Sequence, residues 1–397
     1  MNPGKGTKLM EVTIMKLKGL TSLLAVLGVV GNLSFSPAYL TAAEKAKETP
    51  VTIRLDFIVG GNHAPWFVAW EKGFYAKRGL NVTIQPGTGS ADTIRTIAAG
   101  GADVGFANVS TAIVGRSRGT PIVSVAQLGY IAVTVLWREE TDIKTLKDLE
   151  GKSWAISPRQ AQWFLLPALA KINNMDFASI KIQETAPPLQ PAALLAKKAD
   201  FITMFRASND EVAEMAAAKQ GIRLKRIHMR DAGLDIYGSA LIVKEEDIKR
   251  RPEMIRAYVE GTMEGLRYTR DHQEEALGIL LKLKPELDKE LTRIQIKNGV
   301  EEVFIPAESV ASGYGYMKPD VMEKTVKITN EFFDGAGKVP AAGVYTNQFI
   351  RKLERPITDV IRKDPILYGT IQGTAMRVRL LNLKACLDQT SSHRLVE

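Results

Sequence analysis

The chain is poor in the residues that build covalent and metal-based sites. Cys386 is the only cysteine among 397 residues, so no disulfide can form within the chain. The 4 histidines are never spaced as metal ligands are, and one cysteine cannot complete a zinc centre. The sequence also has no G-x-S-x-G turn and no P-loop. We therefore expect no catalytic residue, no metal and no cofactor.

Basic residues interleaved with aromatic residues are also missing from the middle of the chain. The formal net charge is +9, but lysines and arginines near the two ends supply much of it. Hydrophobic residues make up 45% and charged residues 24% of the chain, as in ordinary globular proteins. The length suits two or three compact units, and nucleic acid is not an expected partner.

The first 38 residues are typical of an export signal. Four lysines precede the apolar run "GLTSLLAVLGVVGNLSF", and the small residues Ser36 and Ala38 suit a signal peptidase. The alternative is a membrane anchor, but glycines and an asparagine interrupt a run that is short for a bilayer span. No cysteine lies nearby to take a lipid. We predict a signal peptide over 1–38, a linker over 39–50 and a periplasmic location.

After the linker, short β-branched segments alternate with helical patterns. "VTIRLDFIV" and "NVTIQPG" have the character of strands, and "PWFVAWEKGFYAKRG" has the apolar spacing of a helix. The alternation starts again near "TLKDLEGKSWAISP", which predicts βαβ units in an α/β fold of two lobes. We expect the chain to cross between the lobes near 133–140 and again near 230–240. The predicted parts are a first lobe over 51–138, a second lobe over 139–235, a helical continuation of the first lobe over 236–365 and a tail over 366–397.

Polar and aromatic residues gather where these strands turn into helices. In open α/β sheets, ligands bind beyond the carboxyl ends of the strands, close to helix N-termini. Such turns are "GGNHAPW", "GTGS" and "ANVST" in the first lobe, and "SPRQAQ" and "MFRASND" in the second. Ser90 and Ser110 are expected to cap the helices that follow. Trp66 and Trp70 lie four residues apart, so we expect one of them in the core and Trp66 nearer a ligand.

Each turn also has an ordinary structural interpretation. The two serines can be helix caps and nothing more, His63 can be a surface or hydrogen-bonded histidine, and Arg159 and Arg206 can be solvated charges. Taken together, however, facing turns from two lobes favour the capture of a small molecule by lobe closure. Aromatic faces suit a planar or apolar body, and an arginine or a helix N-terminus suits an anionic end.

Several longer motifs resemble those of a known family. "EKGFYAKRGL", "GADVGFAN" and "RSRGTPIVSVA" resemble segments of bacterial ABC-transporter solute-binding proteins of the nitrate/sulfonate/taurine type. "IKTLKDLEGKSWAIS" and "YGSALIVKEEDIKRRPEMIRAYVEGTMEGLRYTRDHQEEAL" are similar to the same family at the entry to the second lobe and at the return. Within the family the chain looks most like the branch related to thiamine-pyrimidine synthases. The likeness covers about residues 51–350.

The resemblance implies a two-lobed periplasmic receptor with the type II binding-protein fold, a monomer that passes its solute to an ABC permease in the inner membrane. The implied solute is a small aromatic, heterocyclic or anionic compound, such as a pyrimidine precursor or a sulfonate. The loop "IVGGNH" lacks the tryptophan-proline pattern of closer pyrimidine binders. The predicted ligand-binding residues are Asp56, Asn62, His63, Trp66, Gly89, Ser90, Asn108, Ser110, Ser157, Arg159, Gln160, Arg206 and Tyr237.

Two alternatives to this interpretation stay open. In the synthase branch, the histidine after the first strand is consumed in making a pyrimidine, and a cysteine-rich cluster precedes the return strand. This sequence keeps His63 but has "AGLDIYGSALIV" in place of that cluster, which argues against synthase activity. The other alternative is a receptor that serves a sensor protein in place of a permease. We expect a protein that is not an enzyme.

Overall fold

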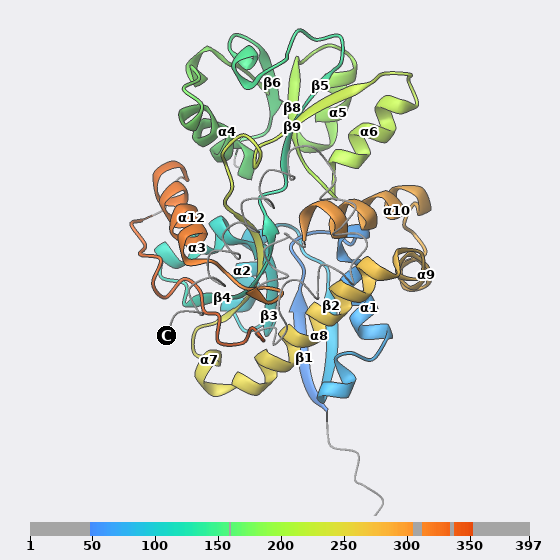
Figure 1. Cartoon of the computed structure of the whole chain (residues 1–397), viewed down its shortest axis with the longest axis vertical. Coiled ribbons are helices and arrows are strands. Elements are labelled where there is room, and N and C mark those ends of the chain that lie inside the picture. The colour runs from blue at the N-terminus through green and yellow to red at the C-terminus, as the bar shows by residue number, and fades with distance from the viewer. Residues whose placement is uncertain (1–47, 159, 305–311, 334–336, 352–397) are drawn as a thin grey trace, which may run out of the picture. The chain divides into compact units, whose positions relative to one another are not determined.

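The computed structural model describes residues 48–158, 160–304, 312–333 and 337–351 (Figure 1). The predicted signal peptide, most of the predicted linker, the predicted tail and Arg159 lie outside these ranges. In the described ranges, no helix has both the length and the apolar character needed to cross a bilayer. The strands of the described chain form two five-stranded sheets.

The first sheet joins four strands from the start of the described chain with one strand that follows the second sheet. Its strands are β1 (Thr49–Arg54), β2 (Leu80–Gln85), β3 (Val104–Asn108), β4 (Ile122–Tyr130) and β10 (Tyr237–Lys244). They lie in the order β2-β1-β3-β10-β4, with β1 parallel to β2 and β3, and β10 antiparallel to both its neighbours. The helices between the strands are η1 (Gly61–His63), α1 (Ala64–Glu71), η2 (Ala76–Arg78), α2 (Ser90–Ala98) and α3 (Val109–Ser117). Every residue of β3 and β4 is buried, which explains their nearly continuous apolar sequences.

The second sheet comes from the middle of the chain. Its strands are β5 (Val133–Arg138), β6 (Ser153–Ile156), β7 (Lys181–Glu184), β8 (Phe201–Phe205) and β9 (Leu224–His228), in the order β7-β6-β8-β5-β9. Its helices are η3 (Leu146–Leu149), α4 (Ala161–Ile172), η4 (Phe177–Ser179), η5 (Pro187–Leu189), α5 (Gln190–Leu195) and α6 (Asp210–Ala218). Trp154 and Phe201 stack in the core between this sheet and α4, with ring centroids 6.1 Å apart. The sheet therefore has a hydrophobic core of its own.

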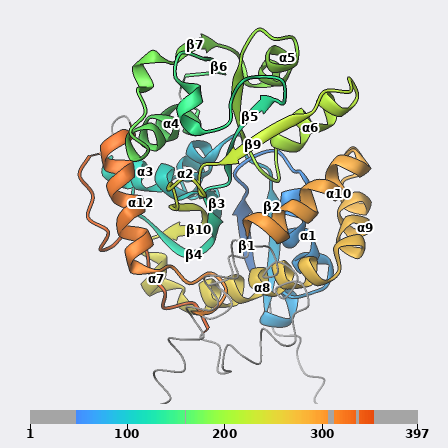
Figure 2. The ribbon, with the colours of Figure 1, turned by 45° about the horizontal axis from the view of Figure 1, so that its top comes forward.

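The helices after β10 pack on the first sheet and reach the second. They are α7 (Asp247–Arg250), α8 (Pro252–Asp271), α9 (Gln273–Leu283), α10 (Lys289–Asn298), the π-helical turn η6 (Gly299–Val303) and α12 (Pro319–Phe332). Buried residues recur every three or four positions along α8, as expected of an amphipathic helix. Helix α12 lies beside α3 and α4 (Figures 1 and 2). It contributes Met322 to the core of the first sheet and Ile328 to the core of the second.

The chain passes between the sheets twice, and the first passage differs from the predicted one. β4 ends at Tyr130 and β5 begins at Val133, and β5 then pairs with β8 and β9 of the second sheet. The second lobe therefore begins before the boundary at 138/139 that we expected. The reason is that β5 follows β4 without a helix, and a local pattern does not show which partners a strand takes. The prediction of a two-lobed α/β fold is confirmed.

Candidate functional site

The loops that follow the parallel strands of the first sheet are tied together at one edge. The backbone N–H of Gly87, after β2, donates to the carbonyl oxygen of Phe57, after β1, at 3.0 Å. The backbone N–H of Asn108, at the end of β3, donates to Ser90 Oγ at 3.0 Å. Because the carboxyl ends of parallel strands lie at the same edge, these bonds build one platform from three loops. This platform is the candidate site.

The side chain of Asp56 is held on this platform by His63. His63 Nδ1 accepts a hydrogen bond from the Gly60 N–H at 3.1 Å, and His63 Nε2 lies 2.9 Å from Asp56 Oδ1. Since Nδ1 accepts, the hydrogen-bond pattern places the ring proton on Nε2, which donates to the carboxylate. The His63 side chain is 1% exposed, whereas that of Asp56 is 24% exposed. The histidine therefore orients a carboxylate that faces solvent, and Asn62 beside it is also partly exposed.

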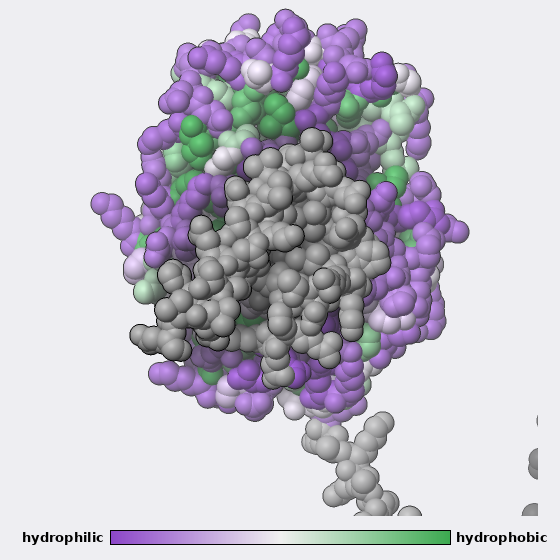
Figure 3. Space-filling view, in the orientation of Figure 1, coloured by the Kyte–Doolittle hydropathy of each residue, from purple (hydrophilic) through white to green (hydrophobic). Residues whose placement is uncertain are grey.

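Two apolar side chains next to Asp56 were not predicted as site residues. On the face seen in Figure 3, the described residues are mostly hydrophilic, with smaller hydrophobic areas between them. Phe57 is 49% exposed and Ile58 is 64% exposed. The sequence pattern predicts both residues in the first strand, but β1 ends at Arg54. Asp56 was the available signal, because a charged residue inside an apolar run often marks the end of a strand.

Trp66 does not lie where the sequence analysis placed it. Trp66 is 1% exposed, and its ring centroid is 4.5 Å from that of Phe106 and 6.4 Å from that of Phe304. Trp70 is 45% exposed. The expected roles of the two tryptophans are thus reversed. The reason is that α1 is buried on nearly all sides over its first six residues, so the turn that carries Trp66 packs against β3.

The predicted serine caps are also wrong. Asn108 caps α3, because its Oδ1 accepts a hydrogen bond from the Thr111 N–H at 3.3 Å. Ser110 is 1% exposed, and its Oγ lies 2.9 Å from Thr329 Oγ1 on α12. Ser90 is the first residue of α2 and follows Gly89, which takes the cap position with a φ of 136°. The hydroxyl of Ser90 is thus available to the loop after β3, which no local pattern reveals.

In the second lobe, the predicted residues mainly support one another. Gln160 Oε1 accepts hydrogen bonds from the Ser157 N–H at 3.0 Å and from Gln190 Nε2 at 2.7 Å, which holds the turn between β6 and α4.

Tyr237, the first residue of β10, is 1% exposed and stacks on Tyr130, with ring centroids 5.4 Å apart. Its hydroxyl accepts from the backbone N–H of Lys318 at 2.6 Å. Tyr237 thus supports the return of the chain to the first sheet.

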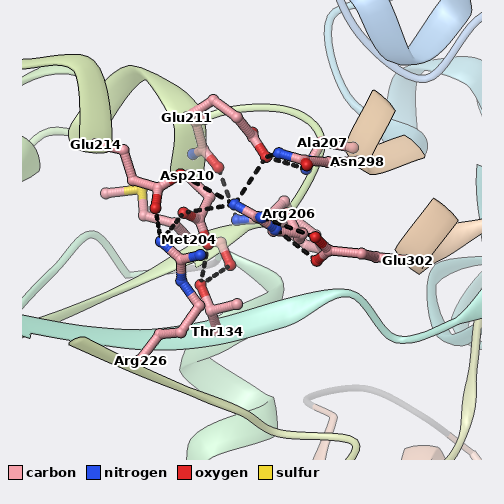
Figure 4. Close-up of polar contacts among 12 residues, drawn as sticks. Thr134, Met204, Arg206, Ala207, Asp210, Glu211, Glu214, Arg226, Asn298 and Glu302 are labelled. Atoms are coloured by element: carbon pink, nitrogen blue, oxygen red, sulfur yellow. Dashed lines mark hydrogen bonds and ion pairs between the residues drawn. The ribbon is translucent and has the colours of Figure 1, made fainter. Parts of the chain in front are cut away.

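Arg206 lies among carboxylates, as Figure 4 shows. Its Nε and Nη2 donate to both oxygens of Glu302, at 2.7 and 2.9 Å. Its Nη1 lies 3.0 Å from Glu214, 3.2 Å from Glu211 and 3.6 Å from Asp210. Burial alone would lower the pKa of the guanidinium, but these carboxylates raise it above its ordinary value. In this structure Arg206 therefore does not offer the open anion site that the sequence analysis expected.

The carboxyl groups around Arg206 differ in their acidity. Burial raises the pKa values of Asp210 and Glu211, which are both 0% exposed. Burial also acts to raise the pKa of Glu302, but its hydrogen bonds with Arg206 outweigh this and lower it. Folding thus disfavours the charged forms of Asp210 and Glu211 and favours the charged form of Glu302.

The variant Glu211→Gln tests the cost of burying that charge. Because the pKa of Glu211 is raised in the folded protein, the wild type loses stability as pH rises from the ordinary value of 4.5 through the raised value. Glutamine keeps the oxygen that accepts from the Ala207 N–H and from Asn298. We expect the variant to gain stability relative to wild type over this window, by about 1.4 kcal/mol per pH unit between the two pKa values. Urea unfolding at several pH values measures this, and a difference that stays constant with pH contradicts it.

Comparisons with known proteins relate most of the chain to others. The family model described as NMT1/THI5 like matches residues 61–276. The riboflavin-binding protein RibY of Chloroflexus aurantiacus is 25% identical over 85% of this chain and 99% of its own. A 4-amino-5-hydroxymethyl-2-methylpyrimidine phosphate synthase of Legionella pneumophila is 21% identical over 78% of this chain and 94% of its own. A formylaminopyrimidine-binding protein of Halalkalibacterium halodurans is 22% identical over 61% of this chain and 72% of its own.

Among solved structures, the chain is similar to the periplasmic aliphatic sulphonate binding protein SsuA from Escherichia coli. The TM-score is 0.61 at 16% sequence identity, over 77% of this chain and 94% of that chain. At this identity the likeness concerns the fold.

Proposed function

The chain belongs to the NMT1/THI5-like family, and from this premise we propose that it is the solute-binding protein of an ABC importer for a planar nitrogen heterocycle of the flavin or pyrimidine type. The observation that carries the proposal is the Asp56 carboxylate, which the buried His63 orients and which the exposed Phe57 and Ile58 follow in the chain. A carboxylate accepts hydrogen bonds from ring N–H and exocyclic amino groups. The aromatic and aliphatic side chains beside it pack against the face of a flat ring.

Two relatives support this choice of ligand class. One is named for binding riboflavin and the other for binding formylaminopyrimidine. Both compounds contain a pyrimidine-type ring with nitrogen-bound hydrogens at its edge. Such a ring matches the platform of the first lobe, which presents one carboxylate together with the partly exposed amide of Asn62.

The charges around the platform argue against a sulfonate or nitrate. Asp56 is negative and would repel an anion at short range. Arg206 is already engaged by carboxylates, and its side chain is only 9% exposed. Of the two arginines that the sequence analysis named, Arg159 lies outside the described residues. A neutral heterocycle is therefore the better fit to the described site.

The proposed mechanism is capture of the solute by closure of two lobes. The ring rests on the first-lobe platform, and the turn of Ser157 and Gln160 closes over it from the second lobe. The chain is exported through its N-terminal segment, acts as a monomer in the periplasm and passes the solute to an inner-membrane permease. The relevant chemistry is binding, with hydrogen bonds made and broken and no covalent step.

One observation keeps synthase activity as a second candidate. Synthases of the same family have identities close to those of the binding proteins, and the chain retains His63 beside the first strand. If the protein makes a pyrimidine, an iron-dependent reaction will consume His63, and mass spectrometry of the peptide that contains it will show the loss. An intact His63 together with a processed N-terminus supports the binding protein.

Replacing Asp56 with alanine tests the proposed ligand contact. In calorimetric titrations of the purified protein, we expect riboflavin or formylaminopyrimidine to bind and aliphatic sulfonates to bind much more weakly. The variant Asp56→Ala should bind the heterocycle at least about 10-fold more weakly, because a hydrogen bond to a charged group contributes about 1.5–3 kcal/mol. The control Asp142→Ala removes a carboxylate that is 83% exposed and should leave affinity unchanged. Tight binding of a sulfonate alone, or equal affinity of both variants, would overturn the proposal.

A further inference from the structure

One helix face reaches both the ligand platform and the second lobe. Gln295 and Asn298 lie on α10, and Glu302 lies on the π-helical turn that continues it. Their spacing of three and four residues places these side chains near one another on the same side of a helix. In both ribbon views α10 lies close to α6 of the second lobe (Figure 2). We call Gln295, Asn298 and Glu302 the α10 bridge.

The side-chain amide of Gln295 forms one hydrogen bond with the first lobe and one with the second. Its Oε1 accepts a hydrogen bond from the backbone N–H of Gly61 at 2.8 Å. Its Nε2 donates to the carbonyl oxygen of Ser208, in the loop between β8 and α6, at 2.7 Å. Gly61 begins the turn that also carries Asn62 and His63. Gln295 is 7% exposed, and its hydrogen bond with Gly61 is buried, whereas the one to Ser208 is partly buried.

The other two bridge residues bind the same region of the second lobe. Asn298 Nδ2 donates to Glu211 Oε1 at 2.7 Å, and Glu302 forms the paired contact with Arg206 described above. These bonds connect helices that follow the first sheet to the loop after β8 and to the start of α6. They are separate from the two passages of the chain between the sheets.

The platform and α10 are too closely packed to move independently. A Cβ atom at Gly61 would lie 2.4 Å from the carbonyl oxygen of Thr292 and 2.7 Å from Gln295 Cβ. Backbone therefore lies against backbone at this contact. A displacement of the Gly61 turn displaces α10, and with it the donors and acceptors that face the second lobe.

We propose that the α10 bridge is a latch, in which Gln295 positions the ligand loop and couples its state to closure of the second lobe. The identity of the ligand rests on the proposed function, but the first test of the latch uses the protein without ligand. When the lobes separate, the bonds from the bridge to Ser208, Glu211 and Arg206 break, while the bond from Gln295 to Gly61 stays within the first lobe. A ligand that holds the Gly61 turn in one position therefore favours the closed state, because the Gln295 amide connects this turn to Ser208.

The variant Gln295→Glu separates the two arms of the latch. A glutamate still accepts from the Gly61 N–H but cannot donate to the Ser208 carbonyl, and it places a negative charge beside that oxygen. The control Gln220→Glu makes the same change of charge at an exposed position. A second variant, Asn298→Leu, removes the donor to Glu211 without adding charge, and it carries the same expectation if Gln295→Glu does not fold.

The measurement is the distance between the lobes in the protein without ligand. Spin labels at Glu253→Cys on α8 and Lys181→Cys on β7, both exposed positions, report it by pulsed electron paramagnetic resonance after Cys386→Ser removes the native thiol. We expect Gln295→Glu to lower the ratio of short to long distances at least about 5-fold, and Gln220→Glu to leave it unchanged. An unchanged ratio in both Gln295→Glu and Asn298→Leu overturns the latch.

Riboflavin then distinguishes failure of the latch from failure of the proposed ligand. With the latch in place, riboflavin should dissociate faster from Gln295→Glu than from Gln220→Glu, while its contact with Asp56 persists. A shifted distance ratio without any binding of riboflavin or formylaminopyrimidine keeps the latch and refutes the proposed function. Binding that depends on Asp56 with an unshifted ratio keeps the function and refutes the latch.

Discussion

Replacing Arg206 with alanine is expected to lower the free energy of unfolding by about 3–5 kcal/mol, because it removes the positive partner of the buried Glu211 and leaves the buried Asp210 with Arg226 alone. Asp210 and Glu211 are 0% exposed, and Arg206 Nη1 lies within 3.6 Å of both. The paired contact with Glu302 is also lost. Urea unfolding near neutral pH, followed by tryptophan fluorescence, measures the effect.

The pH dependence of this loss has a definite sign. Without Arg206, the pKa values of Asp210 and Glu211 rise further, so the variant regains part of its stability as pH falls and these groups take up protons. Arg223 provides a matched control, because its side chain is 84% exposed although it pairs with Glu139 at 2.6 Å. We expect Arg223→Ala to change stability by less than about 1 kcal/mol. Equal losses for the two variants would mean that the cluster around Arg206 contributes no more than a surface ion pair.

Replacing Gly87 with alanine is expected to destabilise the protein by about 3 kcal/mol or more, because an added methyl group has no room. A Cβ atom there would lie 2.0 Å from the carbonyl oxygen of Leu55 and 2.9 Å from the carbonyl carbon of Asp56. The loop after β1 must therefore shift, and with it Asp56 and Phe57. We expect thermal unfolding to show the loss of stability, and titration with riboflavin to show a loss of affinity.

Gly278 is the matched control for this substitution. It lies within α9, where a Cβ atom would meet nothing within 4 Å. Gly278→Ala should stabilise the protein by about 0.5–1 kcal/mol, since alanine is the better helix former. A Gly87→Ala variant as stable as the wild type would contradict the close packing of Gly87 against Leu55 and Asp56.

The order of strands and helices could be predicted because each element has its own spacing of apolar residues in the sequence. Strands β3 and β4 are nearly continuous apolar runs, and the buried positions of α8 recur at helical spacing. The sheet to which β5 belongs could not be predicted in this way. Its pairing with β8 joins residues that are far apart in the chain, and periodicity carries no record of a partner.

The candidate site was predictable in position but not in detail. Asp56 and His63 follow a strand, and that order already places them at the edge where ligands bind. Which of them faces solvent depends on packing, and the structure buries the histidine and exposes the carboxylate. The same limit reversed the roles of Trp66 and Trp70, because contact with Phe106 decides which face of α1 is inside.

Local patterns thus specify the α/β architecture and the turns from which the site is made, since backbone preferences and apolar spacing act over a few residues. Tertiary structure alone decides which side chains in those turns face solvent, that Arg206 is occupied by carboxylates, and that Gln295 meets Gly61 across 234 residues of chain. Burial and hydrogen bonding depend on neighbours brought together by folding, and those neighbours are not adjacent in the sequence.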